Sequence, residues 1–204
     1  MTSVPALRAP IERNAVHLCI DMQRLLTPDG PWPTPWMEAA LQHAVRLVEP
    51  RPAQTVFTRF VPPRTPEEMP GVWRRYFDKW RSVTREFIDP SLLELVPPLV
   101  SFVPPAAVVD KGRYSAFVAS PLQSVLQERG ATTLVISGAE TDICVLATVL
   151  NGIDLGYRIV VAADAVCSSV DPTHDALMTL YGQRFAEQIE LADTETILGN
   201  WSKG

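Results

Sequence analysis

The chain has 204 residues, of which 47% are hydrophobic and 20% charged, so it can close a single hydrophobic core as a soluble globular protein. Its formal net charge of -5 and pI near 5.2 give no electrostatic reason to approach nucleic acid or an anionic membrane. We therefore predict one domain over residues 1–204 and expect neither nucleic acid nor a membrane as a partner.

Residues 1–13 contain no apolar segment of signal-peptide length, and no later stretch is long enough to span a bilayer. We expect an N-terminal extension and a cytoplasmic protein. The chain has three cysteines, Cys19, Cys144 and Cys167, so at least one thiol stays outside any intrachain disulfide. A reducing compartment would leave all three free.

Short, uninterrupted apolar runs alternate with helix-like segments, which is typical of parallel strands covered by helices on both faces. In chain order, strands are predicted at residues 15–21, 55–60, 107–110, 132–137 and 158–162, with a weaker one at 188–192. Helices are predicted at residues 36–49, 121–130, 141–155 and 173–185. The expected fold class is α/β, a single-domain, three-layer αβα, Rossmann-like parallel sheet.

Residues 61–105 interrupt this rhythm with a proline-rich stretch and an aromatic segment. Trp73, Tyr76, Phe77 and Trp80 recur at spacings of three and four, so they share one face of a short helix. Such a face most often packs on the core or against another subunit, and the alternative is a lid over a pocket. We predict an insertion over the sheet.

Three chemically active residues are predicted to lie at one edge of the sheet, because ligands bind at the carboxyl ends of parallel strands. Asp21 ends the first predicted strand, Lys111 follows the third, and Cys144 follows the fourth after the turn at residues 137–140. A carboxylate, an ammonium and a thiol therefore converge.

Cys144 is predicted in the first turn of the helix at residues 141–155. Unpaired N–H groups and the helix dipole at that position stabilise a thiolate and lower its pKa, and they can also bind an oxyanion. The alternative for any single cysteine is a small buried hydrophobe, which suits Cys19 and Cys167.

Asp21 is the candidate base that takes the proton from Cys144 and passes it to a leaving amine, with ordinary loop chemistry as the alternative role. Lys111 would stabilise the negative charge shared by the thiolate and the carboxylate, unless it is simply an exposed lysine. Each residue is a weak signal alone, but three of them at three strand ends form a constellation that chance supplies less readily.

Cofactor and metal motifs are missing from the sequence. His17, His43 and His174 pair with no Asp, Glu or Cys in a recognisable metal-ligand pattern. No phosphate-binding glycine motif follows the first strand. We predict no catalytic metal and no cofactor.

Three segments resemble the isochorismatase-like cysteine hydrolases: Ile-Asp-Met-Gln at residues 20–23, Asp-Lys-Gly-Arg-Tyr-Ser-Ala-Phe at 110–117, and Gly-Ala-Glu-Thr-Asp-Ile-Cys-Val at 138–145. The resemblance covers residues 14–185. The family includes enzymes that act on amides, carbamoyl compounds and ureido compounds. It implies the family's αβα fold.

The resemblance maps the family's Asp-Lys-Cys triad onto Asp21, Lys111 and Cys144. It implies a thioester-type intermediate at Cys144, which water hydrolyses after ammonia or an amine has left. It also implies a cis peptide bond between Ala139 and Glu140, and an oxyanion hole made by the backbone amides of Glu140 and Cys144.

Two departures narrow the resemblance. Metal-binding nicotinamidases carry an Asp-x-His pattern after the second strand, whereas residues 58–61 are Thr-Arg-Phe-Val here, which argues against a nicotinamidase. Isochorismatases cleave a vinyl ether without needing a cysteine nucleophile, so Cys144 favours the amidohydrolase branch. Residues 114–117 nevertheless also resemble the matching segment of isochorismatases.

We therefore predict a cysteine-dependent hydrolase that cleaves a C–N bond of a small amide, ureido or carbamoyl compound, a class that includes anionic substrates. An isochorismatase-type vinyl-ether hydrolase and a non-catalytic scaffold of the same fold are the alternatives. The candidate substrate-binding residues are Gln23, Arg59, Trp73, Trp80, Tyr114, Phe117 and Glu140, with Arg113 as a further recognition group. The family commonly assembles, and the tryptophans suit a subunit contact, so we expect a homodimer or homotetramer.

Overall fold

A single sheet of six parallel strands organises the protein, whose computed structural model describes residues 7–201. The first six residues of the expected N-terminal extension lie outside that range. The strands lie in the order β3-β2-β1-β4-β5-β6. Their bounds are β1 (Val16–Ile20), β2 (Thr55–Phe60), β3 (Ala107–Lys111), β4 (Thr133–Ala139), β5 (Arg158–Cys167) and β6 (Ile189–Ala192).

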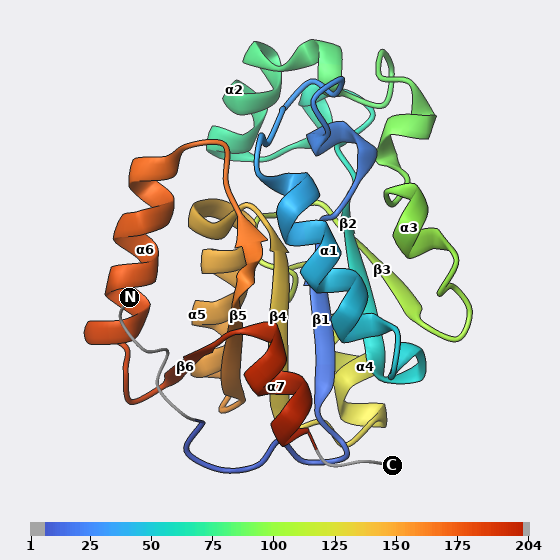
Figure 1. Cartoon of the computed structure of the whole chain (residues 1–204). Coiled ribbons are helices and arrows are strands. Elements are labelled where there is room, and N and C mark those ends of the chain that lie inside the picture. The colour runs from blue at the N-terminus through green and yellow to red at the C-terminus, as the bar shows by residue number, and fades with distance from the viewer. Residues whose placement is uncertain (1–6, 202–204) are drawn as a thin grey trace.

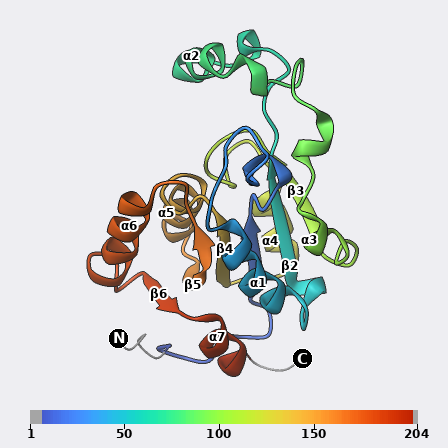
Figure 2. The same cartoon turned by 45° about the horizontal axis from the view of Figure 1, so that its top comes forward.

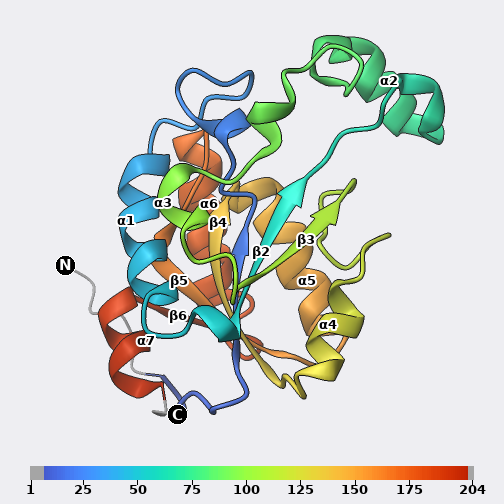
Figure 3. The same cartoon turned by 90° about the vertical axis from the view of Figure 1, so that its right-hand side faces the viewer.

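Helices cover both faces of the sheet, as Figures 1 and 3 show. Their bounds are α1 (Met37–Val48), α2 (Gly71–Lys79), α3 (Pro97–Val100), α4 (Leu122–Glu128), α5 (Leu146–Asp154), α6 (Asp171–Gln183) and α7 (Thr194–Asn200). One core cluster joins the sheet to α4, α5 and α6, and two others join its opposite face to α1, α3 and α7. The predicted three-layer αβα fold in one domain is confirmed.

The central strands are mostly apolar because they are buried on both faces. Every residue of β1 and of β4 is buried, which explains why the sequence shows continuous apolar runs rather than alternation. His17 is the polar exception within β1, and its Nε2 lies 2.7 Å from the Ser137 hydroxyl on β4.

Several element bounds differ from those predicted. β5 runs on to Cys167, past the predicted end at residue 162, because it pairs again with Gly138 and Ala139 of β4 after a register shift. Asp164 within this extension accepts hydrogen bonds of 2.9 and 2.8 Å from the backbone and hydroxyl of Thr194. Thr194 opens α7, a helix that the sequence analysis missed. The helix predicted at residues 141–155 begins as a π-helical turn (Thr141–Val145) before it continues as α5.

The insertion at residues 61–105 contains α2, α3 and short 3-10 turns, and Figures 2 and 3 show α2 projecting beyond the carboxyl edge of the sheet. Phe77 of α2 is fully buried and stacks on Phe60 at the end of β2, with ring centroids 6.5 Å apart. The aromatic face of the predicted short helix therefore packs partly on the body of the protein.

The two ends of the described chain lie side by side near the amino-terminal ends of the strands, at the bottom of Figure 1. Ile11 forms a parallel bridge with Trp201, and the Arg158 guanidinium donates a hydrogen bond of 2.9 Å to the Pro10 carbonyl. No helix within residues 7–201 has both the length and the apolar character needed to cross a bilayer.

Candidate active site

The strand order reverses between β1 and β4, so a crevice opens at their carboxyl ends. The two strands approach closely there, with Gly138 in register with Ile20. Gly138 has φ of 113°, and a Cβ added to it would lie 2.0 Å from the Ile20 carbonyl oxygen. Only glycine permits this approach, which sets where the chain leaves β4 toward Cys144.

The ammonium of Lys111 joins the three predicted catalytic side chains. Its Nζ lies 2.6 Å from Asp21 Oδ2 and 3.4 Å from Cys144 Sγ, and it donates a third hydrogen bond of 2.9 Å to the Arg113 carbonyl. The side chains of Lys111 and Asp21 are 0% and 3% exposed. Lys111 is therefore not the exposed lysine of the alternative interpretation.

Thr58 on β2 orients the Asp21 carboxylate from its other side. The Thr58 hydroxyl donates to Asp21 Oδ1 at 2.6 Å, and the Asp21 backbone N–H donates to the same hydroxyl at 3.1 Å. Asp21 has φ of 50°, a left-handed conformation that is uncommon for a residue other than glycine. These contacts point the second carboxylate oxygen toward Lys111.

Burial dominates the ionisation of this group. It raises the pKa of the Cys144 thiol, which the Lys111 charge only partly opposes, so the unliganded site holds a neutral thiol. This corrects the expectation that the helix start would leave the pKa of Cys144 lowered. Burial by itself would lower the pKa of Lys111, but the Asp21 carboxylate and the hydrogen bonds to Asp21 and Cys144 outweigh it and the pKa is raised.

The other two cysteines are buried and lie in one core cluster on the opposite face of the sheet, as the small-hydrophobe interpretation expects. Burial raises the pKa of Cys19 and of Cys167 to about 12. All three cysteines are free thiols.

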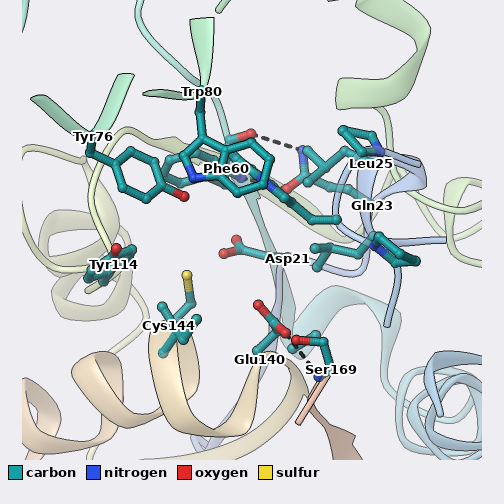
Figure 4. Close-up of a pocket in the computed structure, with 16 residues that line it drawn as sticks. Asp21, Gln23, Leu25, Phe60, Tyr76, Trp80, Tyr114, Glu140, Cys144 and Ser169 are labelled. Carbon is teal, nitrogen blue, oxygen red and sulfur yellow. Dashed lines mark hydrogen bonds between the residues drawn. The ribbon is translucent and has the colours of Figure 1, made fainter. Parts of the chain in front are cut away.

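Asp21 and Cys144 project into a pocket of about 460 Å³ (Figure 4). Most of its wall is apolar or aromatic. The lining residues are Asp21, Gln23, Leu25, Leu26, Pro31, Trp32, Pro33, Phe60, Tyr76, Trp80, Tyr114, Ala139, Glu140, Ile143, Cys144 and Ser169. The Ala139–Glu140 peptide bond on this wall is cis.

Four of the predicted substrate-binding residues line the pocket: Gln23, Trp80, Tyr114 and Glu140. The Gln23 amide is fully engaged, because Nε2 donates to the carbonyls of Phe60 and Leu93 at 3.1 and 2.7 Å and Oε1 accepts from the Phe60 N–H at 2.6 Å. Gln23 therefore positions the loop after β1. Glu140 accepts from the Ser169 N–H at 2.9 Å through one oxygen.

The other predicted residues lie outside the pocket lining, which corrects the sequence prediction. Arg59 points along the sheet edge to Asp110 and Glu94, each 2.7 Å away. Phe117 stacks on Tyr157 beside the core, with ring centroids 5.8 Å apart.

Trp73 and Arg113 lie behind the pocket wall. Trp73 packs on Tyr114 with ring centroids 4.7 Å apart, and the Arg113 guanidinium lies 5.4 Å from the Trp73 ring centre. Arg113 also donates to the Gly112 carbonyl at 2.8 Å. Neither side chain is placed to touch a molecule in the pocket directly.

Sequence analysis missed much of the apolar wall. Trp32 comes from the loop after β1, Phe60 from the end of β2, and Tyr76 from α2. The Pro-Trp-Pro run at residues 31–33, in the long connection after β1, and the aromatic residue that ends β2 were the available signals.

The histidines do not gather. His43 pairs with Asp164 at 3.0 Å, and His174 lies 2.9 Å from the Thr141 hydroxyl. Within residues 7–201, no group of three or more His, Cys, Asp or Glu side chains is arranged to hold a metal ion.

The fold and site together define an αβα domain with a buried thiol, carboxylate and ammonium at the switch point of a parallel sheet. The family described as Isochorismatase domain matches residues 15–193. The chain belongs to this family.

Curated relatives share a shorter segment. The chain is 42% identical over 92 residues to the ureidoacrylate amidohydrolase RutB of Pseudomonas syringae pv. syringae, a match that covers 45% of this chain and 33% of that protein. RutB of Stutzerimonas stutzeri is 41% identical over 92 residues, or 45% of this chain and 32% of the relative. The match thus spans about a third of each relative's length.

Solved structures share the fold along most of the chain. A cysteine hydrolase from Pseudomonas syringae pv. phaseolicola superposes with a TM-score of 0.80 at 21% identity, covering 98% of this chain and 100% of that one. N-carbamoylsarcosine amidase from Thermoplasma acidophilum superposes with a TM-score of 0.70 at 19% identity, covering 89% and 96%.

Proposed function

We propose that this chain is a hydrolase that cleaves a C–N bond of a small amide, ureido or carbamoyl compound through a covalent intermediate on Cys144. The observation that carries the proposal is the Lys111 ammonium, which contacts both the Asp21 carboxylate and the Cys144 sulfur, two groups that line the pocket. The names of the amidohydrolase relative and the amidase neighbour support the C–N bond as the target.

In the first half-reaction, Cys144 attacks the carbonyl carbon as its proton moves to Asp21, because burial keeps the thiol neutral until the substrate arrives. An S–C bond forms, and the carbonyl π electrons become an oxyanion. The backbone amides of Glu140 and Cys144 are the proposed donors to it. The C–N bond then breaks while Asp21 returns its proton to the leaving nitrogen, which leaves a thioester.

In the second half-reaction, water replaces the departed amine. Asp21 takes a proton from the water, whose oxygen attacks the thioester carbonyl. Collapse of the second tetrahedral intermediate breaks the S–C bond, the proton returns to the sulfur, and the acid product leaves. Lys111 stays protonated throughout, since the charges around it raise its pKa.

Residues 61–105 are proposed to cover the site as a lid. They supply Tyr76 and Trp80 to the pocket wall, and Trp73 packs on Tyr114 of the opposite wall. A lid of this kind excludes bulk water from the thioester until the amine has left.

The test measures ammonia release from a panel of primary amides, ureas and carbamoyl compounds by the wild type, Cys144→Ala and Asp21→Asn. We expect both substitutions to abolish release, and an acyl adduct on Cys144 in acid-quenched wild type. Cleavage of a vinyl-ether substrate that survives Cys144→Ala but not Asp21→Asn would instead favour vinyl-ether hydrolysis, in which no thiol is needed.

A matched labelling experiment separates an enzyme from a scaffold. Iodoacetamide labelling near neutral pH, resolved by site with mass spectrometry, should be fastest at Cys144 and should change in Asp21→Asn and Lys111→Met. Cys19 and Cys167 serve as internal controls, since both are buried thiols outside the pocket. Labelling of Cys144 no faster than theirs would contradict the proposal.

We further propose a cytoplasmic homodimer or homotetramer. Exposed large apolar side chains, Val72 at 80% and Phe87 at 58%, lie on the insertion and suit a subunit contact. The three free thiols suit a reducing compartment. Sedimentation as a monomer at micromolar concentration would contradict the assembly, and cell fractionation tests the location.

A further inference from the structure

The charges that face the pocket are all negative. Among the lining residues, which lie within residues 7–201, Asp21 and Glu140 are the ionisable carboxylates and no lysine or arginine takes part. The Asp21 charge is offset by Lys111 at 2.6 Å, behind the wall. Within residues 7–201 no basic side chain forms an ion pair with Glu140, whose carboxylate accepts a hydrogen bond from the neutral Ser169 N–H. The carboxylate of Glu140 therefore sets the sign of the potential in the pocket.

Arg59 and Arg113, which precede the lining residues Phe60 and Tyr114 in the chain, are turned away from the pocket. Arg59 is held by two carboxylates, those of Asp110 and Glu94, and its side chain is 23% exposed at the outer edge. Arg113 lies over the outer Trp73 ring and donates to the Gly112 carbonyl. Neither could pair with the carboxylate of a bound substrate without first leaving these partners.

An aromatic wall stands opposite Glu140, as Figure 4 shows for Phe60, Tyr76 and Trp80. Trp32 packs edge-on against Trp80 with centroids 5.8 Å apart, which holds the rings in place. Aromatic faces attract cations and tolerate apolar groups, but they offer a carboxylate no compensation for lost hydration.

We propose that this pocket selects its substrates by charge, with Glu140 as the specificity-determining residue. Substrates that carry an apolar, cationic group beyond the scissile bond bind in preference to neutral ones. Substrates that carry a carboxylate there are rejected. This inference deepens the proposed function and rests on it for the reaction. It replaces the anionic substrate that the sequence analysis expected, because Arg59 and Arg113 lie outside the pocket.

The test compares two thiol reagents of similar size and opposite charge, 2-(trimethylammonio)ethyl and 2-sulfonatoethyl methanethiosulfonate. In both, the sulfur of Cys144 forms a mixed disulfide and methanesulfinate leaves. At Cys144, the labelling rate with the cationic reagent is divided by the labelling rate with the anionic reagent. This ratio is then divided by the same ratio for free 2-mercaptoethanol, which removes the intrinsic difference in reactivity between the reagents and gives the corrected ratio.

We expect the corrected ratio to favour the cationic reagent on the order of tenfold at low salt, and to fall as salt is added. Glu140→Gln should lower it several-fold, since Gln keeps the carbonyl oxygen that accepts from the Ser169 N–H. Glu128→Gln removes an exposed charge from α4 and is the matched control, with an unchanged ratio.

A corrected ratio of one or less would overturn charge selection, and so would a Cys144 that neither reagent reaches. A ratio that stays high in Glu140→Gln would overturn the role of Glu140. Labelling of Cys144 needs no turnover. A protein that labels with charge selectivity but hydrolyses no substrate would therefore contradict the proposed function and leave this inference standing. Hydrolysis of carboxylate-bearing amides without selectivity would sink this inference alone.

Discussion

Lys111 Nζ lies 2.6 Å from Asp21 Oδ2, and neither side chain is exposed to water by more than 3%. If one of two charges buried this deeply is removed, the other stays in a medium of low dielectric without water to solvate it. An unpaired buried charge of this kind costs a large amount of folding free energy. The ion pair therefore couples the stability of the domain to the chemistry of its candidate site.

Removing one member of this pair should destabilise the protein strongly. Lys111→Met leaves the Asp21 charge buried and unpaired, and we expect it to lower the free energy of unfolding by about 3 to 5 kcal/mol. The double variant Asp21→Asn/Lys111→Met removes both charges and should recover much of the loss. Urea denaturation at pH 7 compares the wild type with both variants.

An exposed pair provides the control for that series. Arg81 lies 3.2 Å from Glu67, with both side chains about half exposed, so Arg81→Met should change the free energy of unfolding by less than about 1 kcal/mol. Equal losses for Lys111→Met and Arg81→Met would contradict the view that burial makes the Asp21 pair costly to break.

Stability should fall in mild acid because of His17. Burial lowers the pKa of His17 from 6.5 to about 3, so the unfolded chain binds a proton below pH 6.5 that the folded chain refuses until about pH 3. The free energy of unfolding should therefore drop as pH decreases through this window, by about 3 kcal/mol between pH 7 and pH 4.

A non-titrating variant isolates this contribution. His17→Asn should flatten the pH dependence of the free energy of unfolding between pH 6.5 and 4, whatever it does to stability at pH 7. Chemical denaturation at a series of pH values measures the slope. Identical slopes for the wild type and His17→Asn would exclude His17 as the source.

Gly138 should tolerate no side chain. Gly138→Ala would place its Cβ 2.0 Å from the Ile20 carbonyl oxygen at a φ of 113°, so β4 would have to move away from β1. We expect an insoluble protein, or a soluble one that has lost Cys144 labelling and amide hydrolysis. Soluble expression and site-resolved alkylation provide the two readouts.

A second glycine supplies the matched control. Gly199 lies in α7, and an added Cβ would meet no heavy atom within 4 Å. Gly199→Ala should raise the free energy of unfolding by up to about 1 kcal/mol through helix propensity. Similar behaviour of the two alanine variants would contradict the close approach at Gly138.

Gln23 should act through position rather than through contact with substrate. Gln23→Leu removes three hydrogen bonds to Phe60 and Leu93, and we expect a loss of about 2 to 3 kcal/mol in the free energy of unfolding. The exposed Gln188→Leu should change it by less than about 0.5 kcal/mol. Thermal and urea denaturation of both variants make the comparison.

The parallel strands along the chain and the place of the reactive residues could be predicted from the sequence. Continuous apolar runs such as residues 16–20 indicate parallel strands buried on both faces, and polar residues that end such runs must gather at one edge. Asp21, Lys111 and Cys144 were identified on this ground, since strand-end position depends on chain order alone.

The pocket wall was harder to predict, because it depends on contacts between segments distant in the chain. From the sequence, Arg59 and Trp80 are equally good candidates for substrate binding, one as a charged and the other as an aromatic side chain. Only the packing of α2 and the charge of Asp110 decide that Trp80 lines the pocket while Arg59 turns away.

The sequence by itself determined the sheet, its layers and the edge at which the candidate chemistry lies, because hydrophobic periodicity and strand ends are local properties. Tertiary structure alone decided that burial raises the pKa of the Cys144 thiol, and that no basic side chain within residues 7–201 pairs with Glu140. Burial and pairing are sums over neighbours from many segments, and no local pattern encodes those sums.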